Sequence, residues 1–407
     1  MEVIQRVVTR VTIGIRGGIM RGTIIASALA VCAIVPSGAF SQAPAPEALR
    51  EWWQAQGQPP VDYVVSKFDS HDWVFLGEYH RIRDDLELLI ELIPAIHNGT
   101  PVRHLAVEFL CRTATATANE LLTAPTHERR DIINFLRSQS PDWAYEEYIE
   151  LFRTTWESNQ VFGEERGPFR FVGLHPCINW EVVNYSPDSA AVAAEIEAQD
   201  RYDEIMAREL TENLLEPGLP ALVFTGIAHS TARFVEHRYG TADQLLRMGN
   251  MVLREPWSDR MFFIALHAPF WDAGTGNDIY PFDGLLDRAM LAHRAPVGFD
   301  VAGSPVERLT HQRRSERSIT AYEFGELYDG YIMHARPLKE AVGATCVSDW
   351  ILTDDELRHF WRNLPSKAAS ERFSHVPLAE FRRDFCMPRP DHGLLFRNRF
   401  RGLPDLR

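Results

Sequence analysis

Residues 73–80 of the chain read WVFLGEYH. The first five form a short apolar run that ends in glycine, and such a run predicts a buried strand ending near Gly77. Glu78 and His80 follow at once and are two residues apart, so in extended chain their side chains face the same way. The segment therefore predicts an acid and an imidazole side by side at the exit of a buried strand.

Similar apolar runs recur along the chain, separated by segments with helical periodicity. Further strands are predicted at 103–109, 169–174, 220–226, 261–266, 297–301 and 330–334. Helical patterns cover 84–96, 114–159 in at least three pieces, and 190–215 as one long amphipathic helix. This alternation predicts an α/β fold with three layers, in which helices flank a mostly parallel central sheet.

The two ends of the chain differ from its middle. Arg16 and Arg21 precede an apolar run over 23–35, and the small residues at 39–41 have the spacing of a signal-peptidase site. The run is shorter than the roughly 20 residues that span a bilayer. We predict a signal peptide over 1–41, cut after Ser41, and a periplasmic or secreted protein with no transmembrane segment once the signal is removed. A linker over 42–60 then leads to an α/β domain over 61–340 and a helical C-terminal subdomain over 341–407.

The mature chain keeps four cysteines, which in an oxidising compartment permit two disulfides. We favour a pair between Cys346 and Cys386. Cys111 and Cys177 lie two or three residues past candidate site residues and could bridge the floor of the site, while four buried thiols are the simpler alternative.

The net charge of −14 is strongly negative. It argues against nonspecific binding to nucleic acid or anionic lipid. It favours a neutral, cationic or metal-complexed partner, such as a small-molecule or peptide substrate, although acidity that only keeps the protein soluble explains it equally well.

Candidate functional residues lie at the ends of four predicted strands. Ligands of parallel α/β sheets bind at the carboxyl ends of the strands. Besides Glu78 and His80, these ends carry Glu108, His175 and His229, and a glycine two or three residues before each histidine predicts a tight exit turn. A carboxylate that ends a buried strand, as Glu108 does, needs a partner or a shifted pKa. We therefore predict one shared site, with His175 equally well explained as a hydrogen-bonded scaffold imidazole.

Two or three imidazoles with two carboxylates suit two kinds of chemistry. They can hold a divalent metal that activates water, or one histidine can act as a general base oriented by a glutamate. The chain has no Gly-x-Ser-x-Gly, His-Glu-x-x-His, Walker or Gly-x-Gly-x-x-Gly motif. This argues against a serine hydrolase, a zincin, a P-loop nucleotidase and a dinucleotide-dependent oxidoreductase.

Four segments in order resemble a known superfamily, the one that joins erythromycin esterases, Tiki-type proteases and ChaN-like haem-uptake proteins. These are VFLGEYH at 74–80, AVEF at 106–109, RYDEIMA at 201–207 and VFTGIAH at 223–229. The resemblance covers roughly residues 62–266. A single residue between Glu78 and His80 is typical of the ChaN-like branch, whereas the esterases have two.

The resemblance implies roles for individual residues. His80, Glu108 and His229 would form the working site, with Glu78 beside them as a fourth catalytic residue, and the first three would be the metal ligands. Arg81 or Arg83 would orient substrate or a carboxylate, unless they are only the solvated start of a helix. We also place Tyr79 and His175 among the candidate substrate-binding residues. Arg201 and Asp203 would support the site from their helix or pair with each other.

Our leading hypothesis is an exported hydrolase that cleaves an ester or amide bond. His80 or a divalent metal (Mn, Zn, Fe or Co) would activate water, with Glu108 and Glu78 as base or ligands. The alternative is a noncatalytic uptake protein that binds haem or iron with the same residues. A structural protein that keeps the fold without chemistry is a third.

Overall fold

The computed structural model describes residues 43–139, 145–237, 244–254, 256–272, 277–314 and 319–345, together with 347, 353, 362–363, 367, 371, 400 and 403–406. The predicted signal peptide and most of the predicted C-terminal subdomain lie outside these residues. Cys346 and Cys386 also lie outside them. No helix among the described residues combines the length and the apolar character needed to cross a bilayer.

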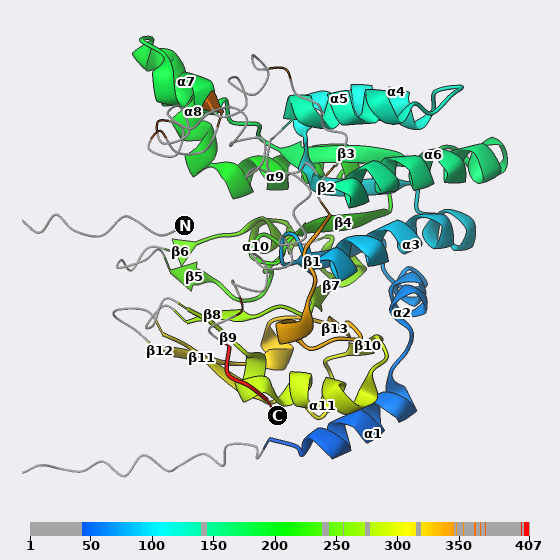
Figure 1. Cartoon of the computed structure of the whole chain (residues 1–407), viewed down its shortest axis with the longest axis vertical. Helices are drawn as coiled ribbons and strands as arrows, with labels where there is room; N and C mark the ends of the chain where they lie inside the picture. The colour runs from blue at the N-terminus through cyan, green and yellow to red at the C-terminus, as the bar shows by residue number, and fades with distance from the viewer. Residues whose placement is uncertain are drawn as a thin grey trace, which may run out of the picture. The chain divides into compact units, whose positions relative to one another are not determined.

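A seven-stranded sheet forms the centre of the fold (Figure 1). Its strands run in the order β10 (Val297–Asp300), β13 (Gly330–Met333), β7 (Met261–Leu266), β1 (Trp73–Glu78), β4 (Ala221–Gly226), β2 (His104–Cys111) and β3 (Arg170–His175). Neighbouring strands are parallel except β10, which is antiparallel to β13. The seven strands are those that the apolar runs predicted.

Helices cover both faces of the sheet, as the alternation of β1 shows. Val74 and Leu76 pack toward one helical layer, while Trp73 and Phe75 pack toward the other. The first layer holds α2 (Pro60–Lys67), α3 (Arg83–Gly99), α4 (Thr115–Leu122), α5 (Arg129–Gln139) and α6 (Glu146–Arg166); the second holds α9 (Tyr202–Leu210), α10 (Met248–Val252), α11 (Leu285–His293) and α1 (Pro46–Gln56). The predicted three-layer α/β fold is therefore confirmed.

The long helix predicted over 190–215 is wrong, because the chain breaks at Arg201. There α8 (Ser189–Asp200) ends and α9 begins, with Arg201 at φ −101° and ψ 24°. None of the residues of α8 is buried, whereas α9 buries Met206 and Leu210 against the sheet. Packing on the sheet therefore decides the direction of α9, and a π-helical turn at Thr211–Leu215 follows it.

The segment predicted as a linker contains α1, a helix that is packed rather than free. Leu49 and Trp53 are buried, and Trp53 lies against Phe299 of β10. The remaining elements are α7 (Trp180–Tyr185), the two-stranded sheets β5 (Glu236–His237) with β6 (Gln244–Leu245), β8 (Phe270–Asp272) with β9 (Asn277–Ile279) and β11 (Thr310–Arg314) with β12 (Ile319–Glu323), and 3₁₀ turns at Arg112–Ala114, Ser258–Arg260, Pro281–Gly284, Phe324–Glu326 and Leu338–Glu340.

Candidate functional site

Three neighbouring strands deliver the central residues of the site. β1, β4 and β2 are adjacent and parallel, so their carboxyl ends meet at one edge of the sheet. β1 ends at Glu78, just before His80; β2 carries Glu108 near its end; and β4 ends at Gly226, three residues before His229. The strand order thus brings together residues that are far apart in sequence.

The Glu108 carboxylate lies at the centre of the site. The backbone N–H of Gly226 donates to its Oε2 at 2.7 Å, and the Tyr202 hydroxyl donates to its Oε1 at 3.2 Å. Nε2 of His229 lies 3.4 Å from the same Oε1, and Nε2 of His80 lies 3.8 Å from it. Two imidazoles therefore face one buried carboxylate oxygen.

Each of these imidazoles is oriented by a second carboxylate. Nδ1 of His80 lies 2.9 Å from Oε1 of Glu78, and Nδ1 of His229 lies 2.7 Å from Oδ1 of Asp203. Because an ionised carboxylate only accepts hydrogen bonds, each Nδ1 carries a proton when it bonds to one. Nε2 of each ring is then the nitrogen turned toward Glu108 and available for chemistry.

The charges of the site are strongly coupled. Burial alone would raise the pKa of Glu108, but His229, His80 and the Gly226 N–H outweigh it and lower this pKa to about 2. Burial alone would lower the pKa of His80, but Glu108 and Glu78 outweigh it and raise this pKa to about 9. The pKa of His229 is raised in the same way, against burial, by Glu108 and Asp203. Without another cation, the His80 ring is therefore protonated at neutral pH, and the same carboxylates favour the protonated form of His229.

Glu78 differs from Glu108 in its surroundings. It is 3% exposed, and its Oε2 is buried without a hydrogen-bond partner among the described residues. Burial raises the pKa of Glu78 in spite of the attraction of His80. The buried Oε2 leaves Glu78 with one acceptor that none of the described residues uses.

Tyr202 and Arg247 belong to the site although the sequence did not predict them. The Tyr202 ring stacks on His229 with centroids 5.2 Å apart, and Nη1 of Arg247 lies 3.4 Å from Oδ2 of Asp203. The backbone N–H of Met248, the first residue of α10, donates to Oδ1 of Asp203 at 2.8 Å. A signal for Tyr202 was present, since it directly precedes Asp203 in the RYDEIMA segment.

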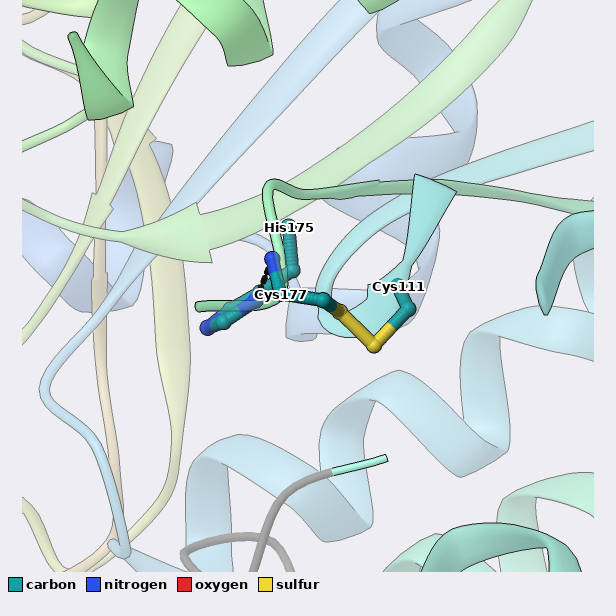
Figure 2. Close-up of side chains that lie close together, drawn as sticks. All are labelled: Cys111, His175 and Cys177. Carbon is teal, nitrogen blue, oxygen red and sulfur yellow. Dashed lines mark hydrogen bonds between the residues drawn. A yellow bond between two sulfur atoms is a disulfide. The ribbon is translucent and has the colours of Figure 1, made fainter. Parts of the chain in front are cut away.

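His175 lies beside this set and is held by a disulfide. Cys111, at the end of β2, is bonded to Cys177, and the Cys177 N–H donates to Nδ1 of His175 at 2.8 Å (Figure 2). The His175 ring meets Tyr202 edge-on, with centroids 5.2 Å apart. Burial and then the charges of His229 and His80, partly offset by Glu108, lower the pKa of His175 to about 4, so the ring is neutral. The bridge that we considered for the site floor is therefore present.

The other predicted residues contact further side chains or lie at the surface. The Tyr79 hydroxyl donates to Asp278, with 3.3 Å to each carboxylate oxygen, and Nε of Arg83 lies 3.4 Å from Glu147. Arg81 is exposed and has a left-handed backbone with φ 77°. Arg201 is exposed and pairs with Glu197 and Glu204 rather than with Asp203.

The glycines at the strand exits serve close packing. Gly77, Gly173 and Gly226 have no positive φ, so the predicted exit turns do not explain them. A Cβ at Gly226 would lie 2.9 Å from the His80 ring and 3.3 Å from Oε2 of Glu108. A side chain there would displace the two central groups of the site.

His80, Glu108 and His229 are of residue types that bind divalent metals, but their ligand atoms lie too far apart to hold one ion without moving. Each histidine has the carboxylate partner that metal-bound imidazoles usually keep. However, Cys111, His175 and Cys177 form the one group of three such ligands within 4.8 Å of one another in the described part of the chain. A single ion bound by His80, Glu108 and His229 would therefore have to draw the two rings closer together.

No protein-family model and no curated protein matches the chain, but solved structures resemble it. A succinoglycan biosynthesis protein is similar over 71% of this chain and 96% of its own, with 11% identity and a TM-score of 0.50. A mutant of the erythromycin esterase EreC in its open conformation is similar over 72% and 95%, with 11% identity and a TM-score of 0.47. Haem-bound ChaN of Campylobacter jejuni is similar over 51% and 86%, with 11% identity and a TM-score of 0.30. At 11% identity, the likeness to the succinoglycan biosynthesis protein shows the fold alone.

Proposed function

We propose that the chain is a hydrolase that cleaves an ester or amide bond with a water molecule held between His80, Glu108 and His229. The observation that supports this most is the pair of carboxylate-oriented imidazoles, Glu78–His80 and Asp203–His229, on either side of Oε1 of Glu108. The His80 side chain is 36% exposed and that of His229 is 18% exposed, so a substrate can reach both rings.

The two imidazoles take complementary roles when one of them has lost its proton. Neutral His80 accepts a proton from water at Nε2, and Glu78 stabilises the imidazolium that forms. The hydroxide adds to the carbonyl carbon, and protonated His229 donates its Nε2 proton to the leaving oxygen or nitrogen as that bond breaks. Glu108 holds the His80 and His229 rings in place, and its negative charge stabilises the one positive charge that the two rings carry between them. A proton passed through solvent from His80 to His229 then restores the site.

A divalent metal, if bound, would be held by Nε2 of His80, Nε2 of His229 and Oε1 of Glu108. It would supply a positive charge that lowers the pKa of a bound water. Such an ion would also replace the Nε2 proton that His80 otherwise holds, and this gives the metal-bound and metal-free forms different pH profiles.

The test is hydrolysis of a panel of p-nitrophenyl esters and aryl amides, measured against pH after chelation and after adding back Mn²⁺ or Zn²⁺. In the metal-free protein kcat/KM should rise toward pH 9, because the His pair must lose one proton and the pKa of His80 is about 9. A metal-dependent enzyme would instead reach its plateau at lower pH. His80→Ala should abolish turnover in either case, while His127→Ala, which changes a histidine packed on Trp156, should not.

Two results would overturn the proposal. One is the absence of turnover on every substrate with and without metal. The other is a haem Soret band that disappears in both His80→Ala and His229→Ala, since this would favour the noncatalytic haem-binding alternative.

We further propose that the protein is exported and acts in the periplasm or outside the cell. The Cys111–Cys177 disulfide supports this, because disulfides persist in oxidising compartments and are rare in the cytosol. Mass spectrometry of the protein recovered from its native compartment tests it, with an N-terminus at Gln42 as the expected result and an intact Met1 or Met20 start as the contrary one.

A further inference from the structure

Cys111, His175 and Cys177 form a cluster that the proposed hydrolysis does not use. Cys111 and His175 are register partners at the ends of the parallel strands β2 and β3, and Cys177 follows two residues later. One nitrogen or sulfur from each of the three lies within 4.8 Å of the others. Figure 2 shows the three side chains gathered at this one point of the fold.

We propose that reduction of the Cys111–Cys177 disulfide converts this cluster into a Cys₂His binding site for a borderline-soft divalent cation such as Zn²⁺. A dithiol supplies the two electrons and two protons that break the sulfur–sulfur bond, and it is oxidised to its own disulfide. The ion then binds the two sulfurs as thiolates, and their two protons pass to solvent.

The dimensions of the cluster suit such an ion. Zn–S bonds of about 2.3 Å and Zn–N bonds of about 2.0 Å at tetrahedral angles place the sulfurs roughly 3.8 Å apart and the nitrogen roughly 3.5 Å from each. These separations fall within the 4.8 Å that the ligand atoms already span. The α-carbons of the two cysteines are 5.5 Å apart, so rotation about the Cα–Cβ bonds can open the sulfurs to this spacing without moving the strands.

His175 already has the tautomer that the site requires. Its Nδ1 accepts the Cys177 N–H at 2.8 Å, so a neutral ring carries its proton on Nε2. The unprotonated Nδ1 therefore has a lone pair, now used by the Cys177 N–H, that can bind the ion in exchange for this hydrogen bond. Cys177 has a left-handed backbone with φ 59°, a conformation that few residues other than glycine adopt, and it keeps the chain folded back on the ring.

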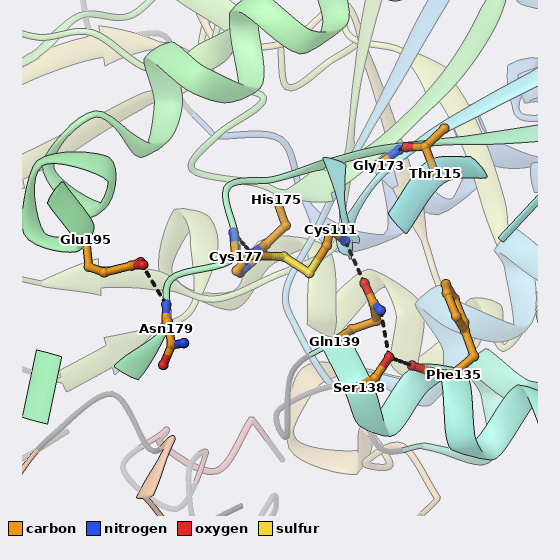
Figure 3. The surroundings of a disulfide bond; sticks show 10 residues. All are labelled: Cys111, Thr115, Phe135, Ser138, Gln139, Gly173, His175, Cys177, Asn179 and Glu195. Carbon is orange, nitrogen blue, oxygen red and sulfur yellow. Dashed lines mark hydrogen bonds between the residues drawn. A yellow bond between two sulfur atoms is a disulfide. The ribbon is translucent and has the colours of Figure 1, made fainter. Parts of the chain in front are cut away.

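Neighbouring contacts hold the three residues in place when the disulfide opens. The Gln139 side chain accepts the Cys111 N–H at 3.3 Å, and the Thr115 hydroxyl accepts the Gly173 N–H at 2.9 Å (Figure 3). Cys111 is buried whereas His175 and Cys177 are half-buried, so the ion can enter from the solvent side. Three protein ligands and an accessible fourth position are the arrangement of an open zinc site with a bound water.

The experiment uses the full chain with its three other cysteines replaced: Cys32→Ser, which lies in the predicted signal peptide, Cys346→Ser and Cys386→Ser. Every thiolate signal then comes from Cys111 or Cys177. A phosphine reduces the disulfide without adding thiols, and Co²⁺ is then titrated anaerobically. The expected result is a near-ultraviolet thiolate-to-cobalt absorption that saturates, is displaced by Zn²⁺, and is missing in the oxidised protein.

Variants assign the signal to the proposed ligands. Cys111→Ser and Cys177→Ser should each abolish the band. Loss of a residue that only hydrogen-bonds to a metal ligand weakens metal binding by roughly tenfold. His175→Ala removes a ligand itself, so it should weaken Co²⁺ binding by more than this. His80→Ala should leave the band unchanged, which separates this cluster from the proposed hydrolytic site.

The proposal fails if the reduced protein gives no band, or if the band survives in Cys111→Ser. The reduced protein could lose its fold, and circular dichroism detects this. If the site exists, adding Zn²⁺ to the reduced protein should restore the spectrum of the folded protein. A reduced, unfolded protein that Zn²⁺ does not rescue would equally overturn it.

Discussion

Gly226 lies against both central groups of the proposed hydrolytic site. Its N–H holds Oε2 of Glu108 at 2.7 Å, and a Cβ in its place would lie 2.9 Å from Cε1 and Nε2 of His80. The backbone conformation of Gly226 is open to alanine, so the effect of a substitution comes from the contact alone. This position therefore separates the geometry of the site from the identity of its residues.

We expect Gly226→Ala to lower kcat/KM by about 100-fold, because a shift of the His80 ring by about 1 Å misplaces the proposed base. Steady-state kinetics on the ester substrate measures it, with urea denaturation to show that the protein stays folded. Gly163→Ala in α6 is the matched control, since the nearest atom to its new Cβ would be 3.9 Å away. Equal losses of activity in the two variants would contradict the steric argument.

Asp203 sets the protonation of His229. Burial lowers the pKa of His229, but Glu108 and Asp203 raise it overall, so replacing the Asp203 carboxylate by an amide should lower this pKa. If His229 is the acid, Asp203→Asn should move the alkaline limb of the kcat/KM profile to lower pH and reduce the maximum by roughly 100-fold. Glu204→Gln, one residue along on the exposed side of α9, should change neither. An unchanged alkaline limb in Asp203→Asn would remove His229 from the role of acid.

At the level of elements, the sequence predicts strands better than it predicts where helices break. Both faces of the sheet are covered, so each strand reads as a continuous apolar run and all seven could be found. The break at Arg201 has no comparable local signal, because it arises where α9 turns to pack on the sheet while α8 does not.

The same difference explains which site residues were foreseen. Glu78, Glu108 and His229 follow directly from strand ends, so local sequence locates them. Tyr202 reaches Glu108 only because α9 starts afresh at that residue, and Arg247 depends on where α10 begins. Positions that depend on the docking of a helix require the tertiary structure.

A buried ion pair joins the first turn of α3, just after His80, to the segment that follows β13. Nε2 of His334, just after β13, bonds to Oδ1 of Asp85 in the first turn of α3, and Oδ2 of Asp85 accepts the Tyr79 N–H at 3.2 Å. Both side chains are buried. The pair therefore fixes the loop between β1 and α3 beside His80.

We expect His334→Ala to lower the free energy of unfolding by about 3–5 kcal/mol, because the substitution leaves the Asp85 carboxylate buried without its partner. Urea denaturation followed by circular dichroism measures it. Arg336→Ala removes the nearby pair with Asp84, whose arginine is 41% exposed, and should cost no more than about 1 kcal/mol. Similar losses of unfolding free energy in the two variants would show that the buried His334–Asp85 pair stabilises the fold no more than an exposed pair does.

Across the whole molecule, the Cys111–Cys177 disulfide ties the edge of the sheet to its interior. β3 is one of the two edge strands of the seven-stranded sheet and pairs only with β2 within it. The disulfide joins the end of β2 to the segment after β3. It thereby closes a loop whose ends are 66 residues apart in the sequence. A cross-link of this span removes much of the conformational freedom of the unfolded chain.

We expect the double variant Cys111→Ser/Cys177→Ser to lose about 4 kcal/mol of unfolding free energy relative to the oxidised protein, the value that loop-closure entropy gives for this separation. Denaturation in urea without reductant measures the loss. A phosphine should destabilise the parent protein by about this amount more than the double variant, since the variant has no bond left to break at this position. The argument fails if the phosphine destabilises both proteins equally, because the stability would then come from a bond elsewhere. It also fails if the double variant is as stable as the oxidised parent, because strain in the native state would then cancel the entropic gain.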